Sequence, residues 1–157
     1  MIWNFKKFLK LSFKEKILFV EAYVTVGVMR AAILRISFEQ LTRSLQHQQN
    51  NMEIQPLGDS ELQTAVTVGR AISRASAYTP WESTCLAQSF TARRMLQKRG
   101  ISGVFYLGVA KNEDDREQIE AHSWSQCGDT IITGGEGHEN FKVLSMFGWS
   151  GQRSKKV

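Results

Sequence analysis

The hydrophobic period of the chain changes at Gly100, and this change constrains the fold more than any other feature. Before Gly100, apolar residues recur at the spacing of one helix face, as Leu86, Phe90 and Met95 do. After it, short runs rich in β-branched and aromatic residues alternate with turn residues. Helices therefore come first and an antiparallel sheet second. This order predicts an α+β domain rather than an alternating α/β one.

Capping residues and turns predict the individual elements. Ser12 and Glu15 have the spacing of a capping box ahead of a long apolar run, and Asp59 or Ser60 can start a second helix. A third helix begins after Ser83 or Thr84 and ends at Gly100. Four strands are expected after it, at residues 104–109, 121–126, 130–133 and 141–147. The predicted organisation is an N-terminal helical region (1–50), a linker (51–58), a core (59–149) and a basic tail (150–157).

The net positive charge of the chain lies in the N-terminal third. The chain of 157 residues carries a net charge of +5, and residues 1–50 hold eight Lys or Arg against three Asp or Glu. The remainder is neutral, with twelve of each, so nucleic-acid binding is not expected. The pairs Arg93-Arg94 and Lys98-Arg99 are expected to face solvent, and contact with an acidic partner is the alternative. Two cysteines and three histidines do not have the spacing of a metal site, and neither a metal nor a cofactor is expected.

The apolar run near the N-terminus does not predict a membrane-spanning helix. Glu21 lies inside the run and Arg30 ends it, and no signal cleavage site is clear. We therefore expect a buried helix and a cytoplasmic protein. Peripheral contact with a membrane stays open, through lysines and the aromatic residues Trp3, Phe5 and Phe8.

Cys85 and His122 are the residues most suited to catalysis. Cys85 lies at the predicted start of a helix, where exposed N–H groups and the helix dipole favour a thiolate and can hold an oxyanion. His122 opens a strand of the following sheet and could act as general base. The alternatives are a buried structural cysteine and a polar residue at a sheet edge. Cys127, the other thiol, is expected to pack beside a turn.

Five short motifs follow one another: WESTCLAQ at 81–88, LGVA at 107–110, AHSW at 121–124, CG at 127–128 and TGG at 133–135. Together they resemble the leader peptidases of lasso-peptide biosynthesis, a group within the transglutaminase-like cysteine protease superfamily. The resemblance covers about residues 70–147. It implies a papain-like α+β core, with Cys85 as nucleophile and His122 as base. It also implies three partners: a ribosomally made precursor peptide, a separate leader-recognition protein and an ATP-dependent macrolactam cyclase.

The resemblance also implies a third catalytic residue, as in a Cys-His-Asp triad, but no residue of this sequence maps cleanly onto it. If Gly128 forms the hairpin tip, residues near 134 lie opposite His122, and Asp129 lies roughly 20 Å away at about 3.3 Å per residue. Glu136 is then the nearest ionisable candidate. Asn140 or a backbone carbonyl could orient the imidazole instead.

Three further residues could touch the substrate or the oxyanion: Trp81, Gln88 and Trp124. Core packing is the alternative for the two tryptophans, and a place on the helix surface is the alternative for Gln88. The resulting hypothesis is a cysteine endopeptidase that removes a leader peptide. Transglutamination or deamidation on the same scaffold and an inactive peptide-binding module are the rival functions.

Overall fold

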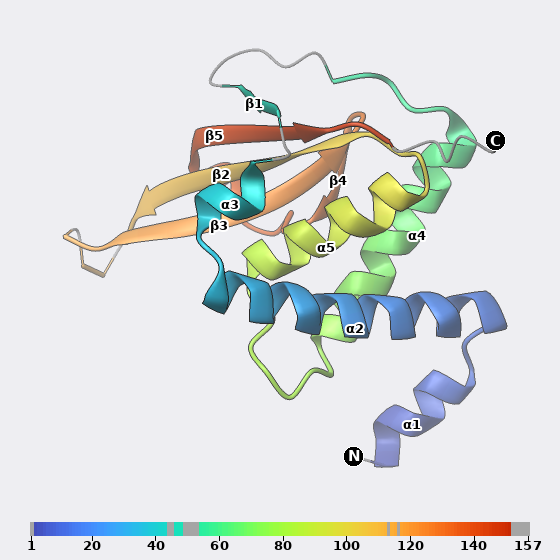
Figure 1. Ribbon diagram of the computed structural model, residues 1–157. Helices are drawn as coiled ribbons and strands as arrows, with labels where there is room; N and C mark the ends of the chain where they lie inside the picture. Colours follow the sequence, from blue (N-terminus) through green and yellow to red (C-terminus); the bar gives the residue numbers. More distant parts are fainter. Residues whose placement is uncertain (1, 44–45, 49–53, 113, 116, 152–157) are drawn as a thin grey trace.

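Two helices cover one face of an antiparallel sheet, and a third helix packs on those two (Figure 1). The computed structural model describes residues 2–43, 46–48, 54–112, 114–115 and 117–151. The helices are α1 (Ile2–Leu9), α2 (Phe13–Arg35), α3 (Phe38–Thr42), α4 (Asp59–Ser76) and α5 (Cys85–Lys98), with a 3-10 turn η1 (His138–Asn140). The strands are β1 (Gln46–Gln48), β2 (Gly103–Lys111), β3 (Ile119–Cys127), β4 (Thr130–Thr133) and β5 (Lys142–Trp149).

The sheet has the order β1-β5-β2-β3-β4, and every neighbouring pair is antiparallel. The predicted α+β class is therefore confirmed. The sequence predicts no strand at residues 46–48, and this prediction is wrong because β1 pairs there with the edge of β5. Backbone hydrogen bonds hold such a pair, so the polar run Gln-His-Gln carries no hydrophobic alternation that would reveal it.

Most predicted helix ends are confirmed. Ser12 and Glu15 form the capping box of α2, and Thr84 is the N-cap of α5. The chain after α5 turns at Gly100, whose φ of 74° suits glycine. The predicted cap of α4 is wrong by one or two residues. Gly58 is the N-cap, and its N–H donates to Glu61 Oε2 at 3.2 Å.

A single hydrophobic core joins the N-terminal helices to the sheet. The rings of Phe90 on α5 and Phe105 on β2 lie 5.2 Å apart, and Phe105 stacks on Phe147 of β5 at 4.9 Å. Ala22 and Val26 of α2 are fully buried in the same core. The division into a helical region and a core stays a prediction. Part of the predicted linker (51–53) and most of the predicted tail (152–157) lie outside the described residues.

An ion pair between α2 and the end of α5 fixes the outer helix. Arg99 donates from Nη1 to Glu21 Oε1 at 3.1 Å and from Nη2 to Oε2 at 2.6 Å. The sequence predicts a solvent-facing Arg99, and this prediction is wrong because Glu21 binds it. These hydrogen bonds lower the pKa of Glu21, against a raising effect of partial burial.

Glu21→Gln is expected to lower the free energy of unfolding by about 1 kcal/mol at neutral pH, because the pair is partly exposed. The pKa of Glu21 is lower in the folded state, so its contribution is present above the ordinary value of 4.5 and is lost as the pH falls below it. Urea unfolding at several pH values measures this. A stability difference that persists at low pH would contradict the assignment.

Candidate active site

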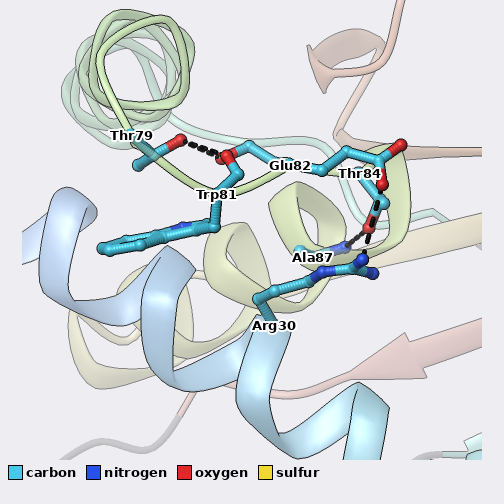
Figure 2. Close-up of polar contacts among 7 residues, drawn as sticks. Arg30, Thr79, Trp81, Glu82, Thr84 and Ala87 are labelled. Carbon is cyan, nitrogen blue, oxygen red and sulfur yellow. Dashed lines mark hydrogen bonds and ion pairs between the residues drawn. The ribbon is translucent and has the colours of Figure 1, made fainter.

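Cys85 is the first residue of α5 and carries a free, half-buried thiol. The first N–H groups of a helix have no partner within the helix. The Thr84 hydroxyl accepts one of them, from Ala87 at 3.3 Å (Figure 2). Among the described contacts, the N–H groups of Cys85 and Leu86 have no hydrogen-bond acceptor. They can stabilise negative charge on the sulfur or on a substrate oxygen.

The loop before Cys85 is tied on both sides. The Thr79 hydroxyl lies 3.0 Å from the Trp81 carbonyl oxygen and 2.6 Å from Ser83 Oγ. The Gln88 amide folds back from α5 and donates to the Ser83 carbonyl at 3.1 Å. These bonds fix where α5 begins, and so they fix the position of Cys85. Gln88 thus braces the loop ahead of the nucleophile candidate.

A second tie to this loop comes from α2. Arg30 reaches across from α2 to Glu82, with its Nη2 3.4 Å from Oε2 (Figure 2). The Trp81 ring lies against α2, with its centroid 5.3 Å from that of Tyr23. A Cβ at Gly27 would come within 2.9 Å of Trp81 Cζ2, so glycine makes room for the indole. Buried Trp81 Nε1 has no hydrogen-bond partner within the described part of the chain.

His122 lies on β3 with one ring nitrogen fixed. Its Nε2 is 2.7 Å from the carbonyl oxygen of Gly134. A carbonyl can only accept a hydrogen bond, so Nε2 carries a proton, and in the neutral tautomer Nδ1 has the lone pair. The imidazole also packs on Phe141 and Trp124, at ring distances of 5.0 and 5.9 Å. The ring is thus oriented with Nδ1 available as a base.

Trp124 forms the support beneath His122. It is buried, and its ring stacks on that of Tyr106 of β2 with centroids 5.3 Å apart. The His138 ring also contacts it, at a centroid distance of 5.5 Å. Burial raises the pKa of Tyr106 in this cluster. On β2, the residue paired with His122 is Gly108. A Cβ at Gly108 would come within 2.9 Å of Trp124 Cζ3. The structure therefore places Trp124 in packing contact with the imidazole.

Strand β3 meets α5 beside both candidates. Ser123 Oγ donates to Ser89 Oγ at 2.8 Å, and both side chains are buried. Ser89 lies one helical turn after Cys85, and Ser123 is the neighbour of His122. Cys85 therefore lies one helical turn, and His122 one strand residue, from the Ser89–Ser123 contact between α5 and β3. Among the described contacts no hydrogen bond joins the thiol to the imidazole; catalytic bonds often form only once substrate is bound.

The hairpin register brings residue 134 to His122. Ser125 pairs with Thr133, and the next residue, Gly134, presents its carbonyl to the imidazole. Gly134 has a φ of 71°, a conformation that favours glycine. Glu136 and Asn140 follow and are exposed, and Asp129 lies in the β3–β4 turn. In the described structure none of these three bonds to His122.

Cys127 is chemically unlike Cys85. It is fully buried at the end of β3, and burial raises its pKa to about 12. Both cysteines are free thiols. A thiol with this pKa holds ~10³-fold less thiolate than an ordinary one. Cys127 is therefore a packing residue in this structure.

Iodoacetamide at neutral pH is expected to modify Cys85 long before Cys127, because only Cys85 is partly exposed and Cys127 holds so little thiolate. Peptide mapping by mass spectrometry reads out each site. In urea both thiols should react. Comparable rates in the folded protein would show that Cys127 is accessible.

Within the described ranges no group of three or more His, Cys, Asp or Glu side chains gathers to hold a metal ion. A hollow between α2 and α4 contains none of the candidate catalytic residues. It is lined by Glu15, Leu18, Thr67, Arg70, Ala71 and Arg74.

Comparison with known families follows the same residues. Residues 28–146 match the family model described as the transglutaminase-like superfamily. The chain belongs to this superfamily. The match runs from the second half of α2 into β5 and includes both Cys85 and His122. No curated protein and no solved structure matches the chain. Members of the superfamily are usually cysteine-based enzymes, which indicates cysteine protease or acyl-transfer activity.

Several contacts of the site have no signal in the sequence. The Ser89–Ser123 hydrogen bond joins two residues that any helix and strand could carry. The Phe141 ring packs on His122 from a segment 19 residues away in the chain. Gly134 indicated a turn in the sequence. That its carbonyl accepts from His122 depends on the register of the hairpin, which the sequence does not show.

Proposed function

We propose that this protein is a cysteine endopeptidase that removes the leader from a lasso-type precursor peptide. The observation that supports the proposal is that two prepared groups, one on α5 and one on β3, lie on either side of the Ser89–Ser123 contact. One is the half-buried thiol of Cys85 at a helix start, and the other is the imidazole of His122, held through Nε2. The motif resemblance and membership of the superfamily support the choice of reaction.

In the proposed mechanism, His122 Nδ1 takes the proton from the Cys85 thiol as sulfur attacks the scissile carbonyl. The N–H groups of Cys85 and Leu86 receive the oxyanion. The imidazolium then gives its proton to the leaving amine, and an acyl-enzyme remains. Water, activated by the same imidazole, hydrolyses the thioester and restores the thiol. Throughout, the Gly134 carbonyl accepts from Nε2–H and steadies the imidazolium.

In this mechanism the Gly134 carbonyl takes the orienting role for which Glu136 is the sequence candidate. Glu136→Ala is therefore expected to lower the cleavage rate by less than about tenfold, because the side chain is exposed and does not bond to His122. Steady-state rates on the precursor measure this. A loss as large as that of His122→Ala would restore Glu136 as the third catalytic residue.

The proposal includes the partners implied by the resemblance. A separate leader-recognition protein would bring the scissile bond to Cys85, which raises the rate by positioning rather than by new chemistry. The freed core peptide would pass to an ATP-dependent macrolactam cyclase. The reaction would take place in the cytoplasm, where the precursor is made.

Acyl transfer to an amine is the second candidate, because the superfamily also carries that chemistry and it shares the acyl-enzyme. The test incubates the precursor with the full chain, with and without the recognition protein, and weighs the products. Hydrolysis gives a leader and a core whose masses sum to that of the precursor plus water. A cross-linked product with loss of ammonia would indicate transglutamination. Binding without any product would indicate an inactive module.

A further inference from the structure

The expectation of a buried helix at α2 is wrong for its outer face, which carries apolar side chains that the other described elements leave exposed. Ala22 and Val26 lie on the inner face and are fully buried. The opposite face exposes an apolar stripe, including 78% of Phe13 and 57% of Val24. The stripe consists of Phe13, Ile17, Val20, Val24, Val28 and Leu34. The first five positions recur every three or four residues, so their side chains share one line along the helix, and Leu34 lies to one side of that line.

The stripe is long and continuous. From Phe13 to Leu34 it runs for ~30 Å at 1.5 Å per residue. Monomeric soluble proteins rarely expose a contiguous apolar surface of this kind, and where they do it marks an interaction site. Aliphatic and aromatic side chains along one exposed helix face suit a flat apolar surface.

The charges around the stripe are positive. Lys6 and Lys10 are exposed on or just after α1, and Lys14 is exposed in the first turn of α2. Figure 1 shows α1 turned away from the sheet at this end of α2. The surface therefore combines an apolar face with a cluster of lysines at one end.

The acidic residues of α2 are neutralised from within the protein. Glu15 accepts from the Ser12 backbone at 2.9 Å and lies 4.0 Å from Arg74, and these contacts lower its pKa. Glu21 binds Arg99 and lies 3.7 Å from Lys98. Neither carboxylate offsets the lysines toward an outside ligand. The net field at this surface therefore favours a negatively charged partner.

We propose that the stripe and the lysines at its end bind the surface of an anionic lipid bilayer, with α2 lying in the plane of the interface. The apolar side chains would enter the boundary of the acyl chains while the lysines contact the headgroups. Binding would place the catalytic core against the membrane without threading the chain through it. Phe8 is not part of this contact, because its ring packs on Phe19 at 5.3 Å.

The packing of α2 favours binding at the surface over crossing. By length and composition α2 could cross a membrane, a test that core helices and signal sequences also pass. Its inner face, however, is held by α4 and α5 and by the ion pairs Glu21–Arg99 and Arg30–Glu82. A spanning α2 would have to break these contacts or take them into hydrocarbon.

The test measures co-sedimentation of the full chain with vesicles. Vesicles with equal amounts of phosphatidylcholine and phosphatidylglycerol should bind it, and phosphatidylcholine alone should bind much less. Added salt should weaken binding, because headgroup attraction is screened. The double variant Lys10→Gln/Lys14→Gln should lose on the order of tenfold in partitioning. Lys111→Gln/Lys142→Gln, on exposed sheet residues, is the matched control and should bind as wild type.

The apolar part of the surface is tested separately. Ile17→Ser/Val24→Ser should lose on the order of tenfold or more in partitioning, because two apolar side chains no longer enter the bilayer. Ile119→Ser/Leu144→Ser removes equally exposed apolar groups from the sheet and should have no effect. Circular dichroism should show all four variants folded, because every changed side chain is exposed.

Four outcomes would overturn the proposal. The first is no binding to the anionic vesicles, and the second is equal loss in the test and control variants. The third is binding that survives high salt and alkaline carbonate, which would indicate a spanning helix. The fourth combines two results: wild type does not bind vesicles, and sedimentation velocity shows a dimer that dissociates in Ile17→Ser/Val24→Ser. These results would assign the stripe to contact with a second copy of the chain. Peptidase activity enters none of these readouts, so failure here leaves the proposed function intact.

Discussion

Cys85→Ala is expected to lower the rate of leader removal by about 10⁴-fold or more, because no other group of the site can form the acyl-enzyme. Alanine suits the first turn of a helix, and the thiol makes no hydrogen bond in the described structure. The variant should therefore fold as wild type and still bind the precursor. Rates from mass spectrometry of the products, with circular dichroism for folding, measure the effect.

Cys127→Ala is the matched control for this substitution. It removes the same atoms, but from a buried thiol whose raised pKa of about 12 keeps it protonated. A small cavity should cost about 1 kcal/mol of stability and leave most of the activity. If Cys85→Ala cut the precursor at a normal rate, or if a folded Cys127→Ala were equally inactive, the nucleophile would be wrongly assigned.

His122→Ala is expected to lower the rate by on the order of 10²–10⁴-fold at neutral pH, the usual contribution of a general base. The imidazole carries its proton on Nε2, because the Gly134 carbonyl accepts there, and this leaves Nδ1 for the thiol. The substitution also removes a ring from the cluster with Trp124 and Phe141. Thermal unfolding must accompany the rates to separate lost stability from lost catalysis.

His138→Ala provides the comparison. His138 also contacts the Trp124 ring and bonds to a backbone carbonyl, that of Gly135 at 2.6 Å. It should therefore lose similar packing but less than tenfold in rate. The double variant Cys85→Ala/His122→Ala should be little worse than Cys85→Ala alone, because the two residues act as one unit. Additive losses would mean that His122 acts independently of the thiol.

The sequence by itself determined the class of fold and the two principal candidates. The change of period at Gly100 separates helices from strands, because side chains repeat every 3.6 residues in one and every two in the other. The caps of α2 and α5 were readable because Ser12 and Thr84 bond to the backbone within the same turn. Such signals are local, and Cys85 owes its place at the start of α5 to one of them.

Contacts between distant parts of the chain were decided only by the tertiary structure. β1 adds to β5 through its backbone, so its polar side chains gave no sign of it. Arg99 looked like a solvent-facing cation, yet it binds Glu21 from 78 positions away. The group opposite His122 is a main-chain carbonyl, which every residue carries, so residue types could not select it over Glu136. The exposed stripe of α2 shows the same limit: its run is apolar on more than one face, and only the packing of α4 and α5 decides which face remains exposed.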